Sequence, residues 1–177
     1  MSERGALHLW SMRSLFCALC LVVMGYHLLP ITPLSYVFMP PDLILCLALA
    51  WTVRRPEFAP LWLIAIIGLM ADLLLLRVPG LWAAMTVIAA SYVHRRRGQM
   101  QSTGFGVEWA QVGLAIALAF LLHRLAYAVL LLKPLPTAGI FTQFFMTILC
   151  YPLMVVLTIW VCRVRKPDVS ESTGYRA

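Results

Sequence analysis

Three charged side chains stand within or beside apolar segments, and they are the first candidates for chemistry. Asp42 follows a pair of prolines, Asp72 lies inside the run GLMADLLLLRVPG (68–80), and Arg124 lies inside another apolar run. Removing an ionised carboxylate from water is costly unless the group is paired, hydrated or neutralised. Asp72 therefore needs an ion-pair partner, local water or a chemical role.

The residue types present limit what chemistry these side chains could support. His27 and His123 are single histidines without the further ligands that a metal site needs, so we expect no metal and no cofactor. Cys17 and Cys20 form a C-x-x-C inside an apolar run, where buried inert thiols are a better interpretation than redox or metal chemistry. Only seven acidic residues are available to supply a catalytic group. We expect no catalytic activity and no nucleic-acid partner.

The composition indicates that these residues belong to a membrane protein. Hydrophobic residues make up 62% of the 177 residues and charged residues only 12%, whereas about 25% of residues in an average soluble domain are charged. Several long stretches lack the polar residues that would coat a soluble surface. We therefore expect an all-α integral membrane protein whose surface faces the lipid bilayer.

Six hydrophobic segments predict a six-transmembrane-helix bundle in a single domain, residues 1–166, followed by a disordered cytoplasmic tail, 167–177. The second and fourth segments are short, since they rise only about 18 and 22 Å against a hydrocarbon core of about 30 Å. Pro40-Pro41 predicts a re-entrant or interfacial piece at 36–38. The predicted spans are approximately 14–34, 42–53, 58–76, 80–94, 107–132 and 139–162.

The distribution of basic residues predicts the orientation of the spans. Eleven of the 14 Lys and Arg residues fall in the tails and loops of one side, while the opposite loops hold only Arg77 and Lys133. Loops rich in Lys and Arg stay in the cytoplasm, so both the N and C termini are expected to be cytoplasmic. The longest loop, 94–109, is expected to be a flexible basic connection near anionic headgroups.

With this orientation, Asp42, Asp72 and Arg124 all fall in the outer half of the membrane. Asp72 lies about 6 Å of helix rise below the outer end of its span and Arg124 about 12 Å, and an arginine side chain can reach towards the interface. We expect an ion pair between Asp72 and Arg124 if the third and fifth spans are neighbours. Asp42 is better interpreted as the cap of the second span than as a ligand. Asp72 lies within its own span, so we do not expect it to be a cap.

Two glycines frame Asp72. Gly68 stands one helical turn earlier on the same face, where it would let another helix approach closely and bury the aspartate in protein. Val78-Pro79-Gly80 predicts a tight turn, so the third and fourth spans are expected to form an antiparallel hairpin. The candidates for structural or interaction roles are therefore Asp42, Gly68, Asp72, Gly80 and Arg124.

An ordered set of short motifs occurs over residues 41–94: Pro41-Asp42-Leu43, Arg54-Arg55-Pro56, Gly68-Leu69-Met70-Ala71-Asp72 and Gly80. In this set the chain resembles the rod shape-determining protein MreD family. Its length, number of spans and basic loops are also compatible with that family. The chain departs from the family pattern at Leu73 to Arg77, where a small or polar residue or two would be expected before the glycine.

The resemblance implies a non-catalytic subunit of the bacterial elongasome in the cell inner membrane, which helps organise lateral peptidoglycan synthesis and rod cell shape. It implies MreC as the direct partner, with MreB, RodA and a class B penicillin-binding transpeptidase in the wider complex. The family is also similar in its six-helix fold to the substrate-binding subunits of energy-coupling-factor transporters. A small-molecule-binding membrane subunit of a transporter is therefore the alternative. The sequence leaves open whether the protein forms a homodimer and which helix face binds a partner.

Overall fold

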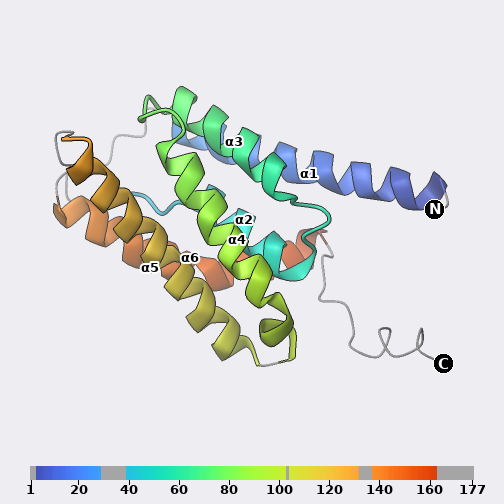
Figure 1. Ribbon diagram of the computed structural model, residues 1–177. Helices are drawn as coiled ribbons and strands as arrows, with labels where there is room; N and C mark the ends of the chain where they lie inside the picture. The colour runs from blue at the N-terminus through green and yellow to red at the C-terminus, as the bar shows by residue number, and fades with distance from the viewer. Residues whose placement is uncertain (1–2, 29–38, 103, 132–136, 163–177) are drawn as a thin grey trace.

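The computed structural model describes residues 3–28, 39–102, 104–131 and 137–162, and these residues form six α-helices and no strand. Successive helices run in opposite directions (Figure 1), so α1, α3 and α5 end on the side of the bundle where α2, α4 and α6 begin. We call this side the Asp42 end and the opposite side the Arg54 end. The helices are α1 (Glu3–Leu28), α2 (Leu43–Arg54), α3 (Leu61–Leu74), α4 (Leu81–Ser102), α5 (Phe105–Val129) and α6 (Thr137–Cys162).

Three of these helices are long and apolar enough to cross a membrane. The apolar helices α2 and α3 have only 12 and 14 residues, and the 22-residue α4 ends in a basic and polar segment. The bundle also exposes many large hydrophobic side chains, which suits a lipid environment better than water. The fold is therefore all-helical with the character of a membrane protein. The three candidate membrane-crossing segments are Leu7–Leu28, Phe105–Val129 and Gly139–Trp160.

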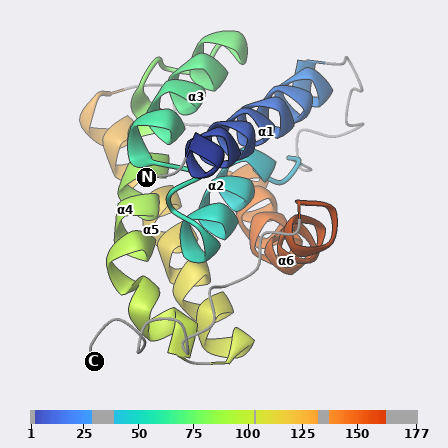
Figure 2. The same ribbon diagram turned by 90° about the vertical axis from the view of Figure 1, so that its right-hand side faces the viewer.

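The short helix α2 lies in the middle of the bundle (Figure 2). Every residue from Ile44 to Arg54 is buried, and α1, α4 and α6 all pack against this helix. Trp51 is fully buried, and its ring centroid lies 5.2 Å from that of Phe16 on α1. A helix that other helices surround does not have to match the thickness of the bilayer, which explains why 12 residues are enough.

α2 begins at Leu43, separated from Pro40-Pro41 by one residue and close to the predicted boundary at residue 42. A proline disfavours helical dihedral angles in the residue before it, so Pro41 keeps Pro40 out of the helix, and Asp42 caps its start. Several predictions concern residues outside the described part of the chain: the interfacial piece at 36–38, the end of the first span at 29–34, Lys133 and the tail at 167–177.

α3 and α4 form the predicted antiparallel hairpin. α3 ends in a Schellman turn, in which the N–H of Arg77 donates to the carbonyl of Asp72 at 2.9 Å and the N–H of Leu76 donates to that of Leu73 at 3.4 Å. Leu76 adopts a φ of 53° and Gly80 a φ of 82°. Glycine adopts a positive φ without a steric penalty, whereas leucine does so at a cost of roughly 1 kcal/mol. Residues 73–77 thus form a helix end closed by a leucine.

The prediction of a flexible loop at 94–109 is wrong. α4 continues to Ser102 and α5 begins at Phe105. Arg and Gln favour helix, and buried Val93 and Met100 hold the extension against the bundle. The Oη of Tyr92 donates to the Oε1 of Gln111 at 2.9 Å and joins α4 to α5. The concentration of charge suggested a loop, although the same residues suit a helix that emerges from the apolar layer.

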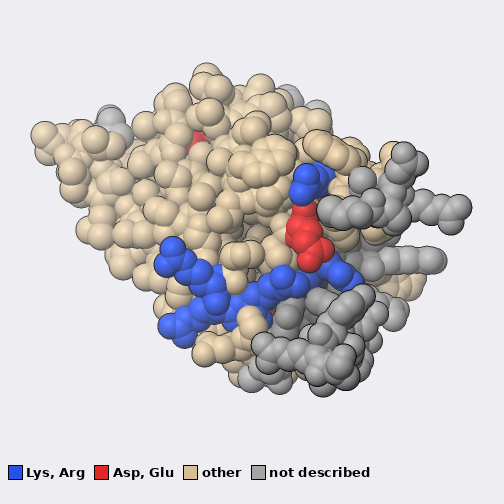
Figure 3. Space-filling view, turned by 45° about the vertical axis from the view of Figure 1, so that its right-hand side comes forward, with Lys and Arg blue, Asp and Glu red and all other residues tan. Residues whose placement is uncertain are grey.

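Basic side chains gather at the Arg54 end of the bundle (Figure 3). The Nε of Arg13 donates to the carbonyl of Glu57 at 3.1 Å, and the Nη2 of Arg97 lies 3.5 Å from the carbonyl of Arg54. These contacts tie α1 to the segment between α2 and α3, and α4 to the last residue of α2. The exposed or half-buried arginines at this end are Arg13, Arg55, Arg95, Arg96 and Arg97.

Candidate functional site

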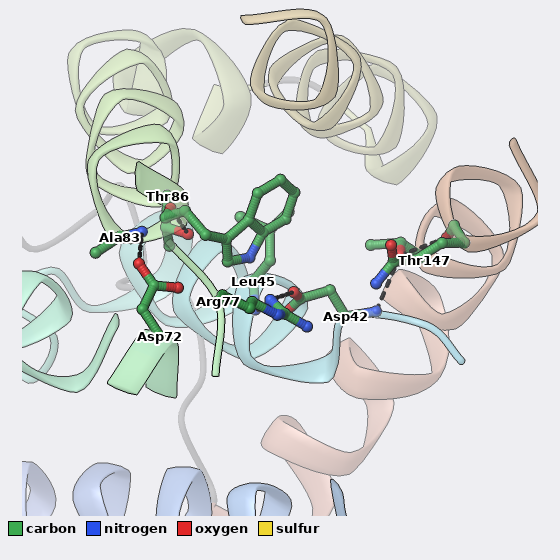
Figure 4. A network of polar contacts seen from close by, with 9 residues as sticks. Asp42, Leu45, Asp72, Arg77, Ala83, Thr86 and Thr147 are labelled. Atoms are coloured by element: carbon green, nitrogen blue, oxygen red, sulfur yellow. Dashed lines mark hydrogen bonds and ion pairs between the residues drawn. The ribbon is translucent and has the colours of Figure 1, made fainter. Parts of the chain in front are cut away.

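Asp72 caps the start of α4, the helix that follows its own. The side chain is fully buried, and its Oδ2 accepts a hydrogen bond from the backbone N–H of Ala83 at 3.1 Å (Figure 4). The backbone amides of Gly80 and Trp82 also face the carboxylate. A helix N-terminus has unsatisfied N–H groups and the positive end of the helix dipole, and a carboxylate complements both. The prediction that Asp72 cannot be a cap is therefore wrong, because the hairpin brings it to a neighbouring helix.

Gly68 allows the close approach of helices on which this cap depends. A Cβ atom at Gly68 would lie 3.0 Å from both the Cα and the Cβ of Ala83, which leaves no room for a side chain without movement. Ala83 thus packs against one residue of α3 and donates its N–H to another, Asp72, one turn further along. The predicted close approach at Gly68 is present, and it buries Asp72 between α3 and α4.

Gly80 supplies the turn that aims the first amides of α4 at Asp72. Its φ of 82° is the left-handed conformation that side chains disfavour. The carbonyl of Gly80 accepts the N–H of Ala84 at 2.9 Å, and the N–H of Leu81 bonds to the carbonyl of Val78 at 3.2 Å. The next amides, those of Trp82 and Ala83, therefore remain for the cap.

Asp42 is the N-terminal cap of α2, as predicted, and it also joins three parts of the chain. Its Oδ1 accepts the N–H of Leu45 at 2.9 Å, and its Oδ2 lies 3.4 Å from the Nη1 of Arg77 in the turn between α3 and α4. Its own N–H donates to the Oγ1 of Thr147 on α6 at 3.0 Å (Figure 4). Asp42 is thus the polar junction between α2, α6 and the α3–α4 turn.

Asp72 and Arg124 are not brought together. The Oδ1 of Asp72 has no hydrogen-bond partner and its Oδ2 bonds to Ala83, so neither oxygen contacts a guanidinium. α4 packs against both α3 and α5, so it separates these two helices. Arg124 instead lines an apolar groove between α5 and α6. The expected ion pair is wrong because the third and fifth helices are not neighbours.

A second buried polar cluster, at the Arg54 end, was not predicted. The Nη1 of Arg54 on α2 lies 3.0 Å from the Oε1 of Glu108 on α5, and both side chains are almost completely buried. The Oη of Tyr151 on α6 donates to the same oxygen at 2.8 Å. Sequence reasoning assigned Arg54 and Glu108 to basic loops. The sequence did contain a signal for this contact. Arg54 and Glu108 have opposite charges, and both lie at ends of predicted spans on the same side of the membrane.

The described residues contain no group of three or more His, Cys, Asp and Glu side chains that could hold a metal ion. Cys17, Cys20, Cys46 and Cys150 are free thiols. The Sγ of Cys46 donates to the carbonyl of Thr147 at 3.2 Å, a structural contact. The ionisable groups that do meet in the interior form helix caps and ion pairs between helices.

The Asp42 end also contains a cavity of about 360 Å³. His27, His123 and Arg77 line it together with aromatic residues, and the ring of His123 lies 4.8 Å from that of Trp82. None of the three charges that the sequence places in the outer half, Asp42, Asp72 and Arg124, is among the residues that line this cavity. It includes Arg77 but not Asp72, which lies inside the hairpin.

Comparisons of the chain with protein-family descriptions, with curated proteins and with solved structures give no match.

Proposed function

We propose that this protein is a non-catalytic membrane subunit of the bacterial elongasome in the cell inner membrane. In this role it binds MreC and helps organise lateral peptidoglycan synthesis and rod cell shape. The observation that carries the proposal is that the residues of the family resemblance have connected structural roles. Asp42 caps α2, Gly68 and Asp72 hold the start of α4, and Gly80 makes the turn between them.

The proposed orientation places both termini and the Arg54 end in the cytoplasm. The arginines of that end support it, because basic residues next to membrane-crossing segments are retained on the cytoplasmic side. All six helices then lie in the membrane, with α2 enclosed by other helices and α3 exposing Trp62, Ile66 and Leu73 to the lipid. The Asp42 end faces the outer side.

The proposed contact with MreC is helix against helix within the membrane. α6 exposes a row of large apolar side chains with a spacing of three or four residues, which is one continuous face of a helix. In lipid such a face gains from close packing against a partner helix rather than from exclusion of water. MreB, RodA and the transpeptidase would join through the wider complex. The row consists of Phe141, Phe145, Leu149, Leu153, Val156 and Trp160.

Affinity purification from membranes tests the proposal. The tagged protein is expected to retain MreC in near-equal amount through detergent extraction, and a tagged unrelated six-span protein serves as the control. Failure to retain MreC, together with recovery of a bound vitamin-like small molecule, would contradict the proposal and favour the transporter alternative.

The alternative function, a small-molecule-binding subunit of a transporter, is favoured by the cavity at the Asp42 end. Its volume of about 360 Å³ and its mixture of aromatic, histidine and arginine side chains suit a small polar ligand. Extraction of the purified protein followed by mass spectrometry of the released small molecules tests this alternative. An empty extract from protein that still binds MreC would rule against it.

A further inference from the structure

Two hollows adjoin at the Asp42 end, one with polar as well as apolar lining residues and the other almost entirely apolar. The cavity described above contains the polar side chains of His27, Arg77 and Gln143. The second hollow is a groove of about 240 Å³ between α5 and α6. Both are lined by Phe120 and Ile140, so they lie on either side of the same two side chains.

The groove is lined almost entirely by apolar side chains. Ala117, Leu121, Phe141 and Phe144 form its walls, and Arg124 is the one charged residue among its lining residues. Both helices that form it, α5 and α6, are long and apolar enough to cross a membrane. A groove of this kind on a lipid-facing surface suits a hydrocarbon chain.

The polar cavity contains a guanidinium held in a defined position. The Nη1 of Arg77 lies 3.4 Å from the Oδ2 of Asp42, and its Cζ lies 5.9 Å from the centre of the Trp82 ring. A guanidinium has five N–H donors, so the contact with one carboxylate oxygen leaves donors for an anion. The Arg77 side chain is about one-third exposed (32%), and that exposure makes it accessible from the cavity.

Charge favours an anionic headgroup over a neutral or cationic one. The groups that line the two hollows include Arg77 and Arg124 and no carboxylate. Asp42 is not among the lining residues and holds Arg77 from behind. A phosphate that contacts Arg77 would gain charge-assisted, bidentate hydrogen bonds.

We propose that the Asp42 end binds one phospholipid, with the phosphate against Arg77 in the polar cavity and an acyl chain in the groove between α5 and α6. A water-soluble anion would fill only the polar cavity, and an uncharged lipid would fill only the groove. The site therefore selects for a molecule that carries both parts. This proposal does not depend on MreC.

Native mass spectrometry of the purified full-length protein tests the proposal with three probes. Phosphatidylglycerol carries both parts, diacylglycerol with the same chains lacks the phosphate, and glycerol 3-phosphate lacks the chains. We expect retention of one phosphatidylglycerol and at least about tenfold weaker retention of the other two probes. Equal retention of diacylglycerol, or equal binding of glycerol 3-phosphate, would overturn the proposal.

Two variants separate the parts of the site. Arg77→Gln should lower phosphatidylglycerol retention about tenfold or more. Because that change also removes the partner of Asp42, Ala117→Phe provides an independent test: it fills the groove without a change in charge. Leu125→Phe is the matched control, since Leu125 is exposed on the same helix but does not line the groove. Unchanged retention in Ala117→Phe, or an equal loss in Leu125→Phe, would overturn the proposal.

Discussion

At the scale of single residues, Ala83 explains why an aspartate is tolerated in an apolar segment. Its N–H donates to the Oδ2 of Asp72, and its Cα and Cβ fill the space that the absent side chain of Gly68 leaves. The carboxylate thus replaces lost hydration with the amides of a helix N-terminus rather than with a cation. Gly68, Asp72 and Ala83 together fix the approach of α3 to α4.

Asp72→Leu should destabilise the protein more than Asp72→Asn. Leucine removes the acceptor at the start of α4 and should cost about 1 to 2 kcal/mol, whereas an asparagine oxygen can still accept the Ala83 N–H. Thermal unfolding in detergent measures both changes.

Arg124→Leu tests whether Asp72 interacts with Arg124. Because Asp72 bonds to Ala83 rather than to Arg124, the effects of Asp72→Asn and Arg124→Leu should add in the double variant. A coupling energy above about 1 kcal/mol between these two sites would show that the side chains interact.

Gly68→Ala should destabilise the protein by about 1 to 3 kcal/mol, because a Cβ would lie 3.0 Å from two atoms of Ala83. Gly113→Ala is a matched control in α5, where a Cβ would meet no atom within 4 Å. That control should be neutral or slightly stabilising, because alanine favours helix. Chemical unfolding of the two variants measures the difference, and equal effects would contradict the close packing.

Much of the site could be predicted at this scale, and the part that was missed has a physical reason. The cap at Asp42 follows from its place after two prolines, and the role of Gly68 follows from its spacing to Asp72. The partner of Asp72 could not be predicted from depth alone, because several groups share the same depth. Depth pointed to Arg124, whereas the hairpin turn supplied backbone amides that are closer.

At the scale of helices, the ends of elements contain the features that sequence patterns describe least well. α3 ends at Leu74 and closes with Leu76 in the left-handed region, where a glycine would be expected. The exposed fraction of Leu76 is 94%. Its side chain therefore packs against little of the bundle, and only its backbone conformation is needed for the turn.

Leu76→Gly should stabilise the protein by up to about 0.5 kcal/mol, since relief of the left-handed strain is partly offset by the added flexibility of glycine. Leu75→Gly is the matched control, because Leu75 has a φ of −90° and gains no relief. That control should be destabilising. Thermal unfolding compares the two variants, and a loss of stability in both would argue that the strain at Leu76 is negligible.

The cluster of Arg54, Glu108 and Tyr151 joins α2, α5 and α6 where no sequence pattern indicated a contact. Arg54→Met should cost about 3 to 5 kcal/mol, because it leaves the buried Glu108 carboxylate without its cation. The added change Glu108→Gln should recover part of that loss, since an amide oxygen can still accept the Tyr151 hydroxyl. Unfolding of the single and double variants measures the recovery.

Arg55→Met provides the control for lost charge at the same end of the bundle. Arg55 is half-buried beside Arg54, and its replacement should change stability by less than about 0.5 kcal/mol. If Arg54→Met costs the same with and without Glu108→Gln, the ion pair does not contribute as described.

At the scale of the whole molecule, hydropathy was a good guide to the number of helices and a poorer guide to their environment. All six predicted segments correspond to helices of the described residues, and most boundaries agree within a few residues. Length alone did not indicate that α2 is central, because a short apolar segment can be a helix buried in protein or part of a re-entrant segment. The packing of α1, α4 and α6 against α2 decides between these possibilities.

The distribution of polar and apolar side chains over the bundle suits a role in a larger assembly. Its polar groups are concentrated in two clusters at opposite ends, around Asp42 and around Arg54. Long apolar faces such as that of α6 remain exposed between these clusters. The proposed function uses such a face as contact area for the transmembrane helix of MreC.

The most direct test of that proposal is co-purification with the isolated transmembrane helix of MreC, fused to an inert soluble protein that replaces all other MreC domains. The proposal predicts that this helix alone is retained in near-equal amount, whereas a scrambled helix of the same composition is not. Retention of the scrambled helix to the same extent, or of neither helix, would contradict it.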